Sequence, residues 1–336
     1  MFFHLDYQEA DRILTGLDCL VFGPKLRPGE GRFSDTDQIG YGRLSSLQEL
    51  VWDRKSDWSA REIVSPQRQS LFYFTEEAMT EPAAEGDARP ILLFLRSCDL
   101  AAFRALDQIY LHNGRPDPYY QALRSRLRPA LLSCPETFEN CFCRSLDQNP
   151  GEHALAGHFS RDGLIMQVND PFFHSLGEGR AVLDFHWPRP GEGQAQEALE
   201  LPEGDFGPAA AAHEMWREYD ERCVACGRCN LVCPTCTCFS MQDIHYRDNP
   251  ANGERRRVWA SCMIDGFTDM AGGHAFRPKH GDRVRFRVLH KIYDFKKRYG
   301  FHMCVGCGRC SDVCPQYISF AGAVSKLAAA RKRGEL

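Results

Sequence analysis

Two cysteine runs constrain this chain more than any other feature of its sequence. Each run has the pattern C-x₂-C-x₂-C-x₃-C-P, and nine of its twelve positions are identical in the two copies. The runs begin eighty-one residues apart, at Cys223 and at Cys304. This spacing is typical of proteins that hold four-iron iron–sulfur clusters. The fold therefore has to bring two distant loops together around inorganic cofactors.

The spacing also predicts which cysteines share a cluster. In two-cluster ferredoxins the fourth cysteine of each run ligates the cluster of the other run. The predicted ligands of cluster 1 are Cys223, Cys226, Cys229 and Cys314, and those of cluster 2 are Cys304, Cys307, Cys310 and Cys233. Gly227 and Gly308 suit a tight turn close to the inorganic core. Zinc is the alternative, because Cys₄ zinc sites also use C-x₂-C pairs, but four evenly placed cysteines plus proline, present twice, favour clusters.

Each run also carries an arginine, Arg228 in the first and Arg309 in the second. A cation beside a cluster stabilises its reduced, more negative state. The alternative is that both arginines face solvent, where charges contribute little. The sequence leaves these two interpretations open.

The composition points to a reducing compartment. The chain has 336 residues with sixteen cysteines, 43% apolar residues and a net charge of −4. It shows neither a signal-peptide pattern at its N-terminus nor an apolar run long enough for a membrane span. The charge gives no reason to expect a nucleic acid or an anionic membrane as a partner. We expect a cytoplasmic protein whose clustered cysteines bind metal.

A further group of cysteines lies in the N-terminal half. The pattern predicts a buried strand from Pro90 to Cys98, a helix capped by Asp99, and a second strand from Arg128 to Cys134. Strand, helix and strand in this order favour parallel pairing, which places both strand-ending cysteines at one sheet edge. The third cluster predicted there has the ligands Cys98, Cys134, Cys141 and Cys143. The alternative is a set of buried free thiols.

These elements define the expected architecture. Residues 1–208 are predicted to form an α/β or α+β domain, with residues 181–185 as one of its strands and residues 24–42 as loop or irregular strands. Residues 188–208 are rich in Gly, Pro, Glu and Gln and form either a linker or a surface loop. Helical patterns flank both cysteine runs, which predicts an all-helical, ferredoxin-like dicluster domain over residues 209–336.

Four cysteines remain after these assignments. Cys236, Cys238 and Cys262 flank the first run, and we expect them to pack next to its cluster, while Cys19 is expected to be structural. No Gly-rich dinucleotide or phosphate-binding motif occurs. The chain therefore shows no nucleotide site of its own, and we expect it to bind neither flavin nor sirohaem alone and to contain no catalytic residue.

Several N-terminal phrases resemble the iron–sulfur electron-transfer subunit of anaerobic sulfite reductase and, more broadly, the beta subunits of soluble hydrogenases. The phrases include Arg54-Lys-Ser-Asp-Trp-Ser, Phe94-Leu-Arg-Ser-Cys-Asp-Leu, Leu106-Asp-Gln-Ile-Tyr-Leu and Phe138-Glu-Asn-Cys-Phe-Cys. The resemblance implies an electron-transfer subunit in a complex that reduces sulfite to sulfide. Its expected partners are a flavin subunit that oxidises NADH and a sirohaem subunit. The resemblance also favours the third cluster.

Two other functions remain open at this point. Besides the sulfite reductase subunit, the chain fits the beta subunit of a soluble NAD(P)-linked hydrogenase or a related oxidoreductase. A function of a different class is a structural protein whose clusters or zinc ions only hold its fold. The duplicated run disfavours this third function, because one metal site would suffice to stabilise a fold.

Overall fold

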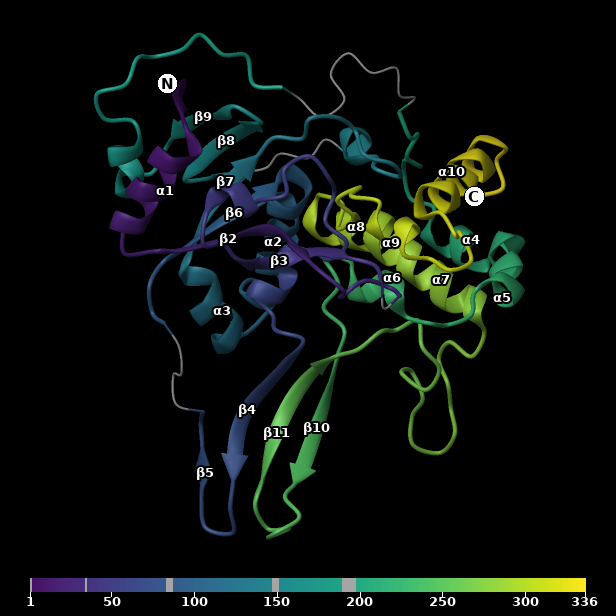
Figure 1. Ribbon diagram of the computed structural model, residues 1–336. Coiled ribbons are helices and arrows are strands. Elements are labelled where there is room, and N and C mark those ends of the chain that lie inside the picture. The colour runs from purple at the N-terminus through teal and green to yellow at the C-terminus, as the bar shows by residue number, and fades with distance from the viewer. Residues whose placement is uncertain (1, 34, 83–86, 147–150, 189–197) are drawn as a thin grey trace.

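The computed structural model describes residues 2–33, 35–82, 87–146, 151–188 and 198–336. Its N-terminal part contains a seven-stranded sheet with the order β1-β9-β8-β7-β6-β2-β3 (Figure 1). Strands β2, β6, β7 and β8 run parallel, and the outer pairs are antiparallel. The strands are β1 (Phe2–Leu5), β2 (Leu20–Arg27), β3 (Gln38–Arg43), β6 (Ile91–Arg96), β7 (Leu127–Leu132), β8 (Leu155–Ser160) and β9 (Gly163–Val168).

Helices cover both faces of this sheet. On one face lie α1 (Tyr7–Gly16) and the 3₁₀ turn η4 (Pro171–Leu176), and on the other lie α2 (Ser97–Tyr110) and α3 (Pro118–Ser125). Strand β6 shows the reason, since all six of its residues are buried. Phe94 packs into the core on the α1 side, and Leu93 packs into the core on the α2 side. A strand covered on both faces reads as a continuous apolar run, which is the pattern in the sequence.

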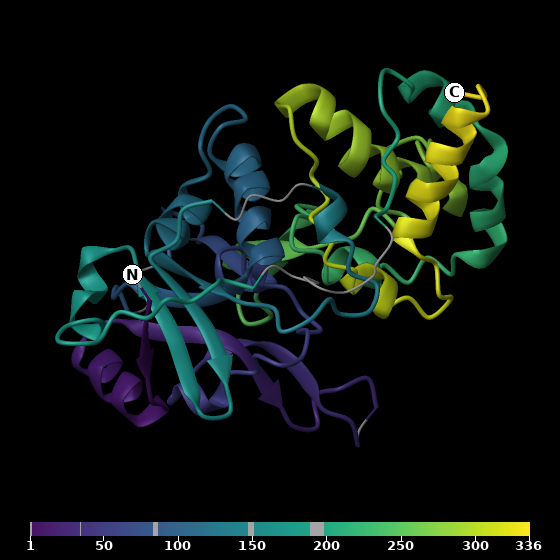
Figure 2. The same cartoon turned by 90° about the horizontal axis from the view of Figure 1, so that it is seen from above.

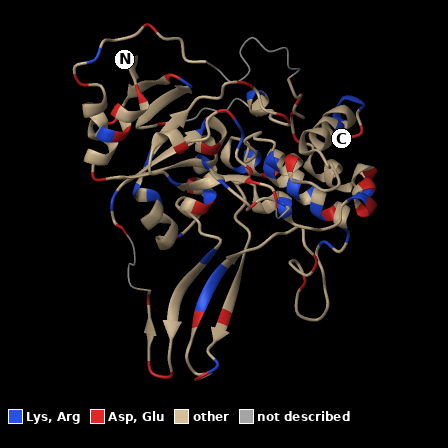
Figure 3. Cartoon of the chain, viewed as in Figure 1, with Lys and Arg blue, Asp and Glu red and all other residues tan. Residues whose placement is uncertain are grey.

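A second, four-stranded antiparallel sheet extends away from this body as an arm (Figure 1). Its order is β10-β11-β4-β5, with β10 (Phe239–His245), β11 (Gly253–Trp259), β4 (Arg68–Phe74) and β5 (Met79–Thr80). Charges of both signs are interspersed along the arm (Figure 3), as in the ion pair between Arg255 and Asp243 at 2.6 Å. The arm joins strands from both sides of the predicted boundary at residue 208. The division into 1–208 and 209–336 stays a prediction.

The C-terminal part packs short helices around an apolar core that contains Trp216, Val288, Val324 and Leu327. Seen from above, these helices lie on the opposite side of the molecule from α1 and β9 (Figure 2). The elements are α4 (Gly207–Ala212), η5 (Glu214–Arg217), α5 (Glu218–Arg222), α6 (Arg228–Leu231), α7 (His280–Leu289), the π-helical turn η6 (His290–Asp294), α8 (Phe295–Tyr299), α9 (Arg309–Asp312) and α10 (Phe320–Lys332). Three 3₁₀ turns complete the fold: η1 (Leu47–Glu49), η2 (Ala60–Ile63) and η3 (Cys143–Leu146).

The structure corrects the expectation that residues 209–336 are all helical. Strands β10 and β11 lie between the two cysteine runs, and β11 pairs with β4, which lies more than 170 residues earlier. Pairing at this sequence distance leaves no local signal. Residues 24–42 contain parts of the regular strands β2 and β3, and residues 181–185 make only an isolated bridge between Leu183 and Phe2. Residues 189–197 of the predicted linker lie outside the described residues.

The strand–helix–strand prediction is confirmed, because β6 and β7 are parallel neighbours with α2 and α3 between them in the chain. One detail is wrong. Arg96 occupies the N-cap of α2, so Asp99 lies within the first turn of the helix, and its side chain is used for a different contact described below. None of the helices in the described residues is long and apolar enough to span a bilayer.

Candidate iron–sulfur sites

The four N-terminal cysteines gather at the carboxyl edge of the large sheet. Cys98 follows the end of β6, and Cys134 follows the end of β7. The thiol of Cys143 interacts electrostatically with that of Cys134, and Cys98 interacts with Cys143. Cys141 interacts with Cys143 in the same way. The structure thus brings these four side chains together, as parallel strand pairing requires. Their role as ligands stays a prediction.

The second cysteine run packs directly against this edge. The amide of Phe142 donates to the carbonyl of Gly306 at 2.8 Å, and the Cys141 thiol donates to the carbonyl of Cys307 at 3.3 Å. Cys98, Cys143 and Cys307 belong to one small apolar core. Sequence reasoning did not anticipate this contact between the third cysteine group and the second run.

Gly308 lies in this contact and has to be a glycine for two reasons. Its φ of +71° belongs to the left-handed region, and a Cβ atom would lie 2.3 Å from the carbonyl oxygen of Asn140. The turn expected at Gly227 is also present, with φ at +74°. The corresponding glycines of the two runs therefore share a conformation, and that of Gly308 additionally lets the second run approach the N-terminal part.

The first run lies next to the end of the second run. One pocket is lined by Cys223, Cys226, Cys229, Cys310 and Cys314 together with the apolar side chains of Val284, Val288 and Phe320. Cys310 and Cys314 both come from the second run, so the two runs meet at this pocket, and the interlocked assignment stays a prediction. Cys226 is exposed, which places this group at the molecular surface.

The remaining cysteines of the second run lie deeper. Cys304 interacts with both Cys307 and Cys310. Cys233 and Cys304 both interact with the ammonium group of Lys291. The thiol of Cys233 also hydrogen-bonds to the thiol of Cys236, a neighbour that the interlocked assignment did not include. The place of Cys233 in the second cluster stays a prediction.

Buried cations face each cysteine group. Arg287 and Lys291 are 9% and 2% exposed and form an ion pair with no carboxylate in the described part of the chain. Arg287 donates to the amide oxygen of Asn230 at 3.0 Å, and Lys291 donates to the hydroxyl of Thr235 at 2.9 Å. Burial opposes both charges, but the neighbouring thiol groups outweigh burial and raise the pKa of each cation.

The N-terminal group has its own cation, Arg96. This arginine is 2% exposed, and its guanidinium lies 3.6 Å from the sulfur of Cys134. It also donates to the backbone carbonyls of Trp52 and Arg54, which fix its position. A buried cation without a carboxylate partner is strongly unfavourable unless an anion compensates it. Sulfur bonded to iron supplies that negative charge, so the buried cations fit metal-bound thiolates.

Burial favours the neutral form of the thiols when no metal is bound to them. It raises the pKa of Cys304 and of Cys229 to about 12, and that of Cys143 to about 11. These thiols therefore keep their protons at neutral pH until a metal displaces them. All sixteen cysteines are free of disulfide bonds. The donor set of soft sulfur atoms in a compact, dry surrounding fits iron–sulfur clusters.

No three His, Cys, Asp or Glu side chains within the described ranges lie as they would around a single metal ion. In a four-iron cluster each thiolate binds a different iron, so its ligands surround a core instead of converging on one point.

The two arginines of the runs differ. Arg228 is exposed, as the surface alternative predicts. Arg309 is 1% exposed, and its guanidinium forms an ion pair with Asp99. Arg309 therefore lies beside Cys307 and Cys98 with its charge already compensated. The sequence could not distinguish the two positions, since the local motif around them is the same.

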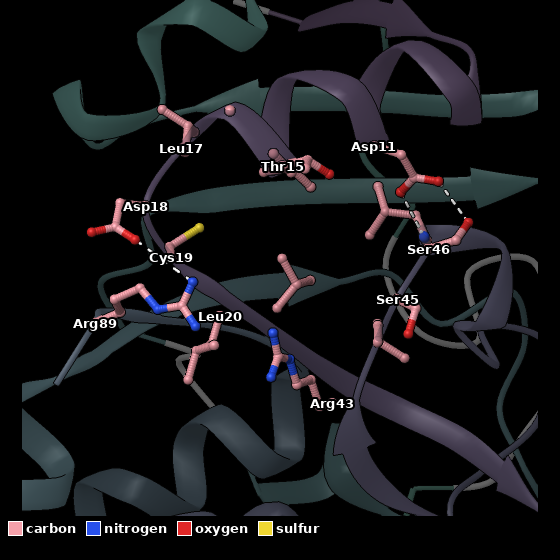
Figure 4. Close-up of a pocket in the computed structure, with 15 residues that line it drawn as sticks. Asp11, Thr15, Leu17, Asp18, Cys19, Leu20, Arg43, Ser45, Ser46 and Arg89 are labelled. Atoms are coloured by element: carbon pink, nitrogen blue, oxygen red, sulfur yellow. Dashed lines mark hydrogen bonds and ion pairs between the residues drawn. The ribbon is translucent and has the colours of Figure 1, made fainter. Parts of the chain in front are cut away.

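Cys19 lies away from the other cysteines. It lines a cavity of about 500 Å³ beside α1, together with Asp11, Asp18, Arg43 and Arg89 (Figure 4). Arg89 pairs with Asp18 at 3.6 Å, and Asp11 accepts from the Ser46 hydroxyl at 2.6 Å. Dashed lines in Figure 4 mark these contacts, and Cys19 is the one cysteine among the lining residues.

Comparisons with known proteins identify the family of the chain. Residues 222–318 match the family described as a 4Fe-4S dicluster domain. The chain is also similar to the sulfhydrogenase 2 subunit beta of Pyrococcus furiosus, with 31% identity over 315 residues, which cover 89% of each chain. A match of this identity and coverage is evidence of common family membership. The chain therefore belongs to the hydrogenase beta-subunit family and is an iron–sulfur electron-transfer subunit with a C-terminal four-iron dicluster domain.

Proposed function

We propose that this chain relays single electrons through three four-iron clusters, between the catalytic subunit of a hydrogenase-type complex and its NAD(P)-linked flavin subunit. Two clusters are held by the ligand sets of the cysteine runs, and the third is held by Cys98, Cys134, Cys141 and Cys143. The observation that carries the proposal is the pair of buried cations Arg287 and Lys291, which face sulfur atoms and no carboxylate among the described residues.

The contacts between the cysteine groups suggest the order of the relay. The N-terminal group meets the second run at Cys307, and the second run meets the first at Cys310, which lines the pocket of the first group. A chain of three neighbouring sites, N-terminal, second and first, supports stepwise electron transfer across the molecule. The clusters supply reversible one-electron storage. The protein fixes their positions, keeps water away from them and compensates their charge.

The surface near the first run suits a docking partner. Cys226 is exposed, and the apolar side chains of Val224, Ile264 and Tyr317 are 51%, 38% and 87% exposed near it. Apolar side chains around an exposed redox site are the usual composition of a protein contact. We assign this end of the relay to one partner of the complex and the N-terminal end to the other.

The proposal keeps the expected division of labour between two domains. Residues 1–208 would hold the third cluster, and residues 209–336 would hold the two clusters of the runs. The arm formed by β4, β5, β10 and β11 connects these parts. Sixteen cysteines without a disulfide bond support a reducing, cytoplasmic location for the complex.

The catalytic partner distinguishes two versions of this function. The name of the Pyrococcus furiosus relative supports a hydrogenase. A sulfite reductase complex is the second candidate, because the phrases that resemble its iron–sulfur subunit lie at the proposed third cluster. Lys55, Arg96 and Asp99 belong to these phrases, and each contacts a cysteine or the second run. In that version a sirohaem subunit reduces sulfite to sulfide.

Anaerobic purification of the native complex tests this proposal. A co-purifying nickel–iron subunit with hydrogen-dependent reduction of the clusters would establish the hydrogenase version. A sirohaem absorption band and sulfite-dependent reoxidation would establish the sulfite reductase version. Clusters that dithionite cannot reduce, as judged by electron paramagnetic resonance, would contradict electron transfer altogether. Stoichiometric zinc in place of iron would contradict the cluster assignment.

A further inference from the structure

Three cysteines outside the predicted ligand sets lie together beside Cys233. Side-chain hydrogen bonds link the thiols of Cys233 and Cys236, of Cys236 and Cys238, and of Cys238 and Cys262. Cys236 and Cys262 are each 6% exposed. The amide of Asn230 donates to the sulfur of Cys262 at 3.1 Å. These cysteines form a second buried thiol group next to the first run.

The arm brings these cysteines together. Cys238 directly precedes β10, and Cys262 closely follows β11, so pairing of the two strands places both at the base of the arm. The amide of Ala260 donates to the carbonyl of Cys238 at 3.0 Å and extends this pairing. The site therefore depends on the hairpin that the sequence pattern did not reveal.

A buried cation faces this thiol group. Arg61 comes from η2 in the N-terminal part and is 3% exposed. It donates to the carbonyl of Leu231 at 3.1 Å and to the carbonyl of Cys236, and it stacks on Trp259 with 3.5 Å to the ring centroid. Its Nε has no hydrogen-bond partner, and no ion pair links it to a carboxylate in the described ranges.

The charge of Arg61 needs compensation. The acidic groups that interact with it include the thiols of Cys236, Cys233 and Cys238 and the phenol of Tyr110. Lys291 interacts with Cys236 as well as with Cys233 and Cys304. It likewise lacks a carboxylate partner in the part of the chain that the structure describes. A buried Arg61 with no negative charge beside it would be strongly unfavourable. Metal-bound thiolates would supply the missing negative charge.

We propose that Cys236, Cys238 and Cys262 ligate a further iron–sulfur cluster, in addition to the three of the relay. Each thiol loses its proton to solvent as its sulfur bonds to iron. Cys233 adjoins the site but serves the second cluster under the interlocked assignment, so this site has three cysteine ligands of its own. Binding parts the thiols, because each sulfur then binds a separate iron and their mutual hydrogen bonds are replaced.

Iron and acid-labile sulfide in the full-length, anaerobically purified chain test the proposal. The variants Cys238→Ser and Cys262→Ser should each lose the iron of one cluster, about three or four irons, relative to the wild-type chain. Cys19→Ser, which changes a buried cysteine outside all these groups, should keep the wild-type iron content. Equal iron in Cys262→Ser and the wild type would overturn the proposal, as would zinc bound in place of iron at these residues.

Native mass spectrometry of the wild-type chain provides a second test that needs no variant at this site. A mass that corresponds to four clusters supports the proposal. If the wild-type chain carries three clusters and the Cys98→Ser variant carries two, the proposal is overturned, because all the clusters would then belong to the relay. The Cys98→Ser variant thus separates failure of the third cluster in the proposed function from failure of the site at Cys236, Cys238 and Cys262.

Discussion

Arg309 of the second cysteine run and Asp99 of α2 form an ion pair that is completely enclosed by the protein. The guanidinium Nη2 lies 2.6 Å from Oδ2, and each side chain is 1% exposed. The hydroxyl of Tyr41 donates to the same carboxylate at 3.0 Å, and Arg309 also donates to the carbonyl of Ser56 at 2.9 Å. This network ties the second run to the carboxyl edge of the large sheet.

Substitution of Arg309 by Gln should therefore destabilise the protein strongly. The change leaves the Asp99 carboxylate buried without a cation, which typically costs about 3–5 kcal/mol. Urea unfolding measures the effect. The control is Arg228→Gln, which removes the exposed arginine at the same position of the first run and should change the free energy of unfolding by less than about 0.5 kcal/mol. Equal effects of the two substitutions would contradict a structural role for the buried pair.

Gly308→Ala should separate the second run from the N-terminal part. The new methyl group would meet the carbonyl of Asn140 at 2.3 Å, at a residue whose φ is +71°. Strain at a positive φ contributes roughly 1–3 kcal/mol, and the clash adds to it. Gly300→Ala is the matched control, because φ is +83° there but the position faces open space. Thermal unfolding should show the larger loss for Gly308→Ala, and similar losses would argue against the close approach.

The interlocked assignment predicts different outcomes for two serine variants. Cys233→Ser should damage the cluster of the second run, and Cys314→Ser should damage the cluster of the first. Each variant should lose signal from one cluster and about four irons. Electron paramagnetic resonance of the dithionite-reduced proteins distinguishes the two clusters. Loss of the first-run cluster in Cys233→Ser would refute the exchange of fourth ligands between the runs.

Arg287→Gln should lower the reduction potential of the clusters nearest to it. The guanidinium stabilises an added electron through its interaction with Cys310 and Cys229, and removing one buried charge at short range shifts a potential by on the order of 100 mV. A redox titration followed by electron paramagnetic resonance measures the shift. Arg285→Gln, on the same helix but donating to the carbonyl of Ala211, should leave the potentials unchanged. A shift of the same size in both variants would exclude a specific effect.

His290 should make the protein less stable as the pH falls below 6.5. Burial, together with the charge of Lys291, lowers the pKa of His290 to about 4. Between pH 6.5 and 4 the unfolded chain binds a proton that the folded chain does not, so stability decreases as the pH falls through this range. His290→Gln should show a weaker decrease than the wild type in anaerobic thermal unfolding. An unchanged slope in His290→Gln would contradict the shift.

The local pattern was sufficient for several elements. Strand β6 reads as an apolar run from Ile91 to Leu95 because both faces of the sheet are covered, and helix α2 follows from the spacing of its apolar residues. Parallel pairing of β6 with β7 then predicted where Cys98 and Cys134 meet. The pattern failed for the hairpin of β10 and β11, of which β11 pairs with the distant β4, and for the N-cap of α2, where Asp99 forms a buried ion pair with Arg309.

The sequence by itself determined the chemistry of the protein, because the spacing of each cysteine run matches the ligand geometry of a four-iron cluster and does not depend on the rest of the fold. Tertiary structure alone decided which cations accompany the sulfur atoms. Arg61, Arg96 and Lys291 come from separate segments, and only packing reveals that each is buried without a carboxylate partner among the described residues. It also separated Arg309 from Arg228, because identical local motifs acquire different burial and charge partners when the surrounding surfaces differ.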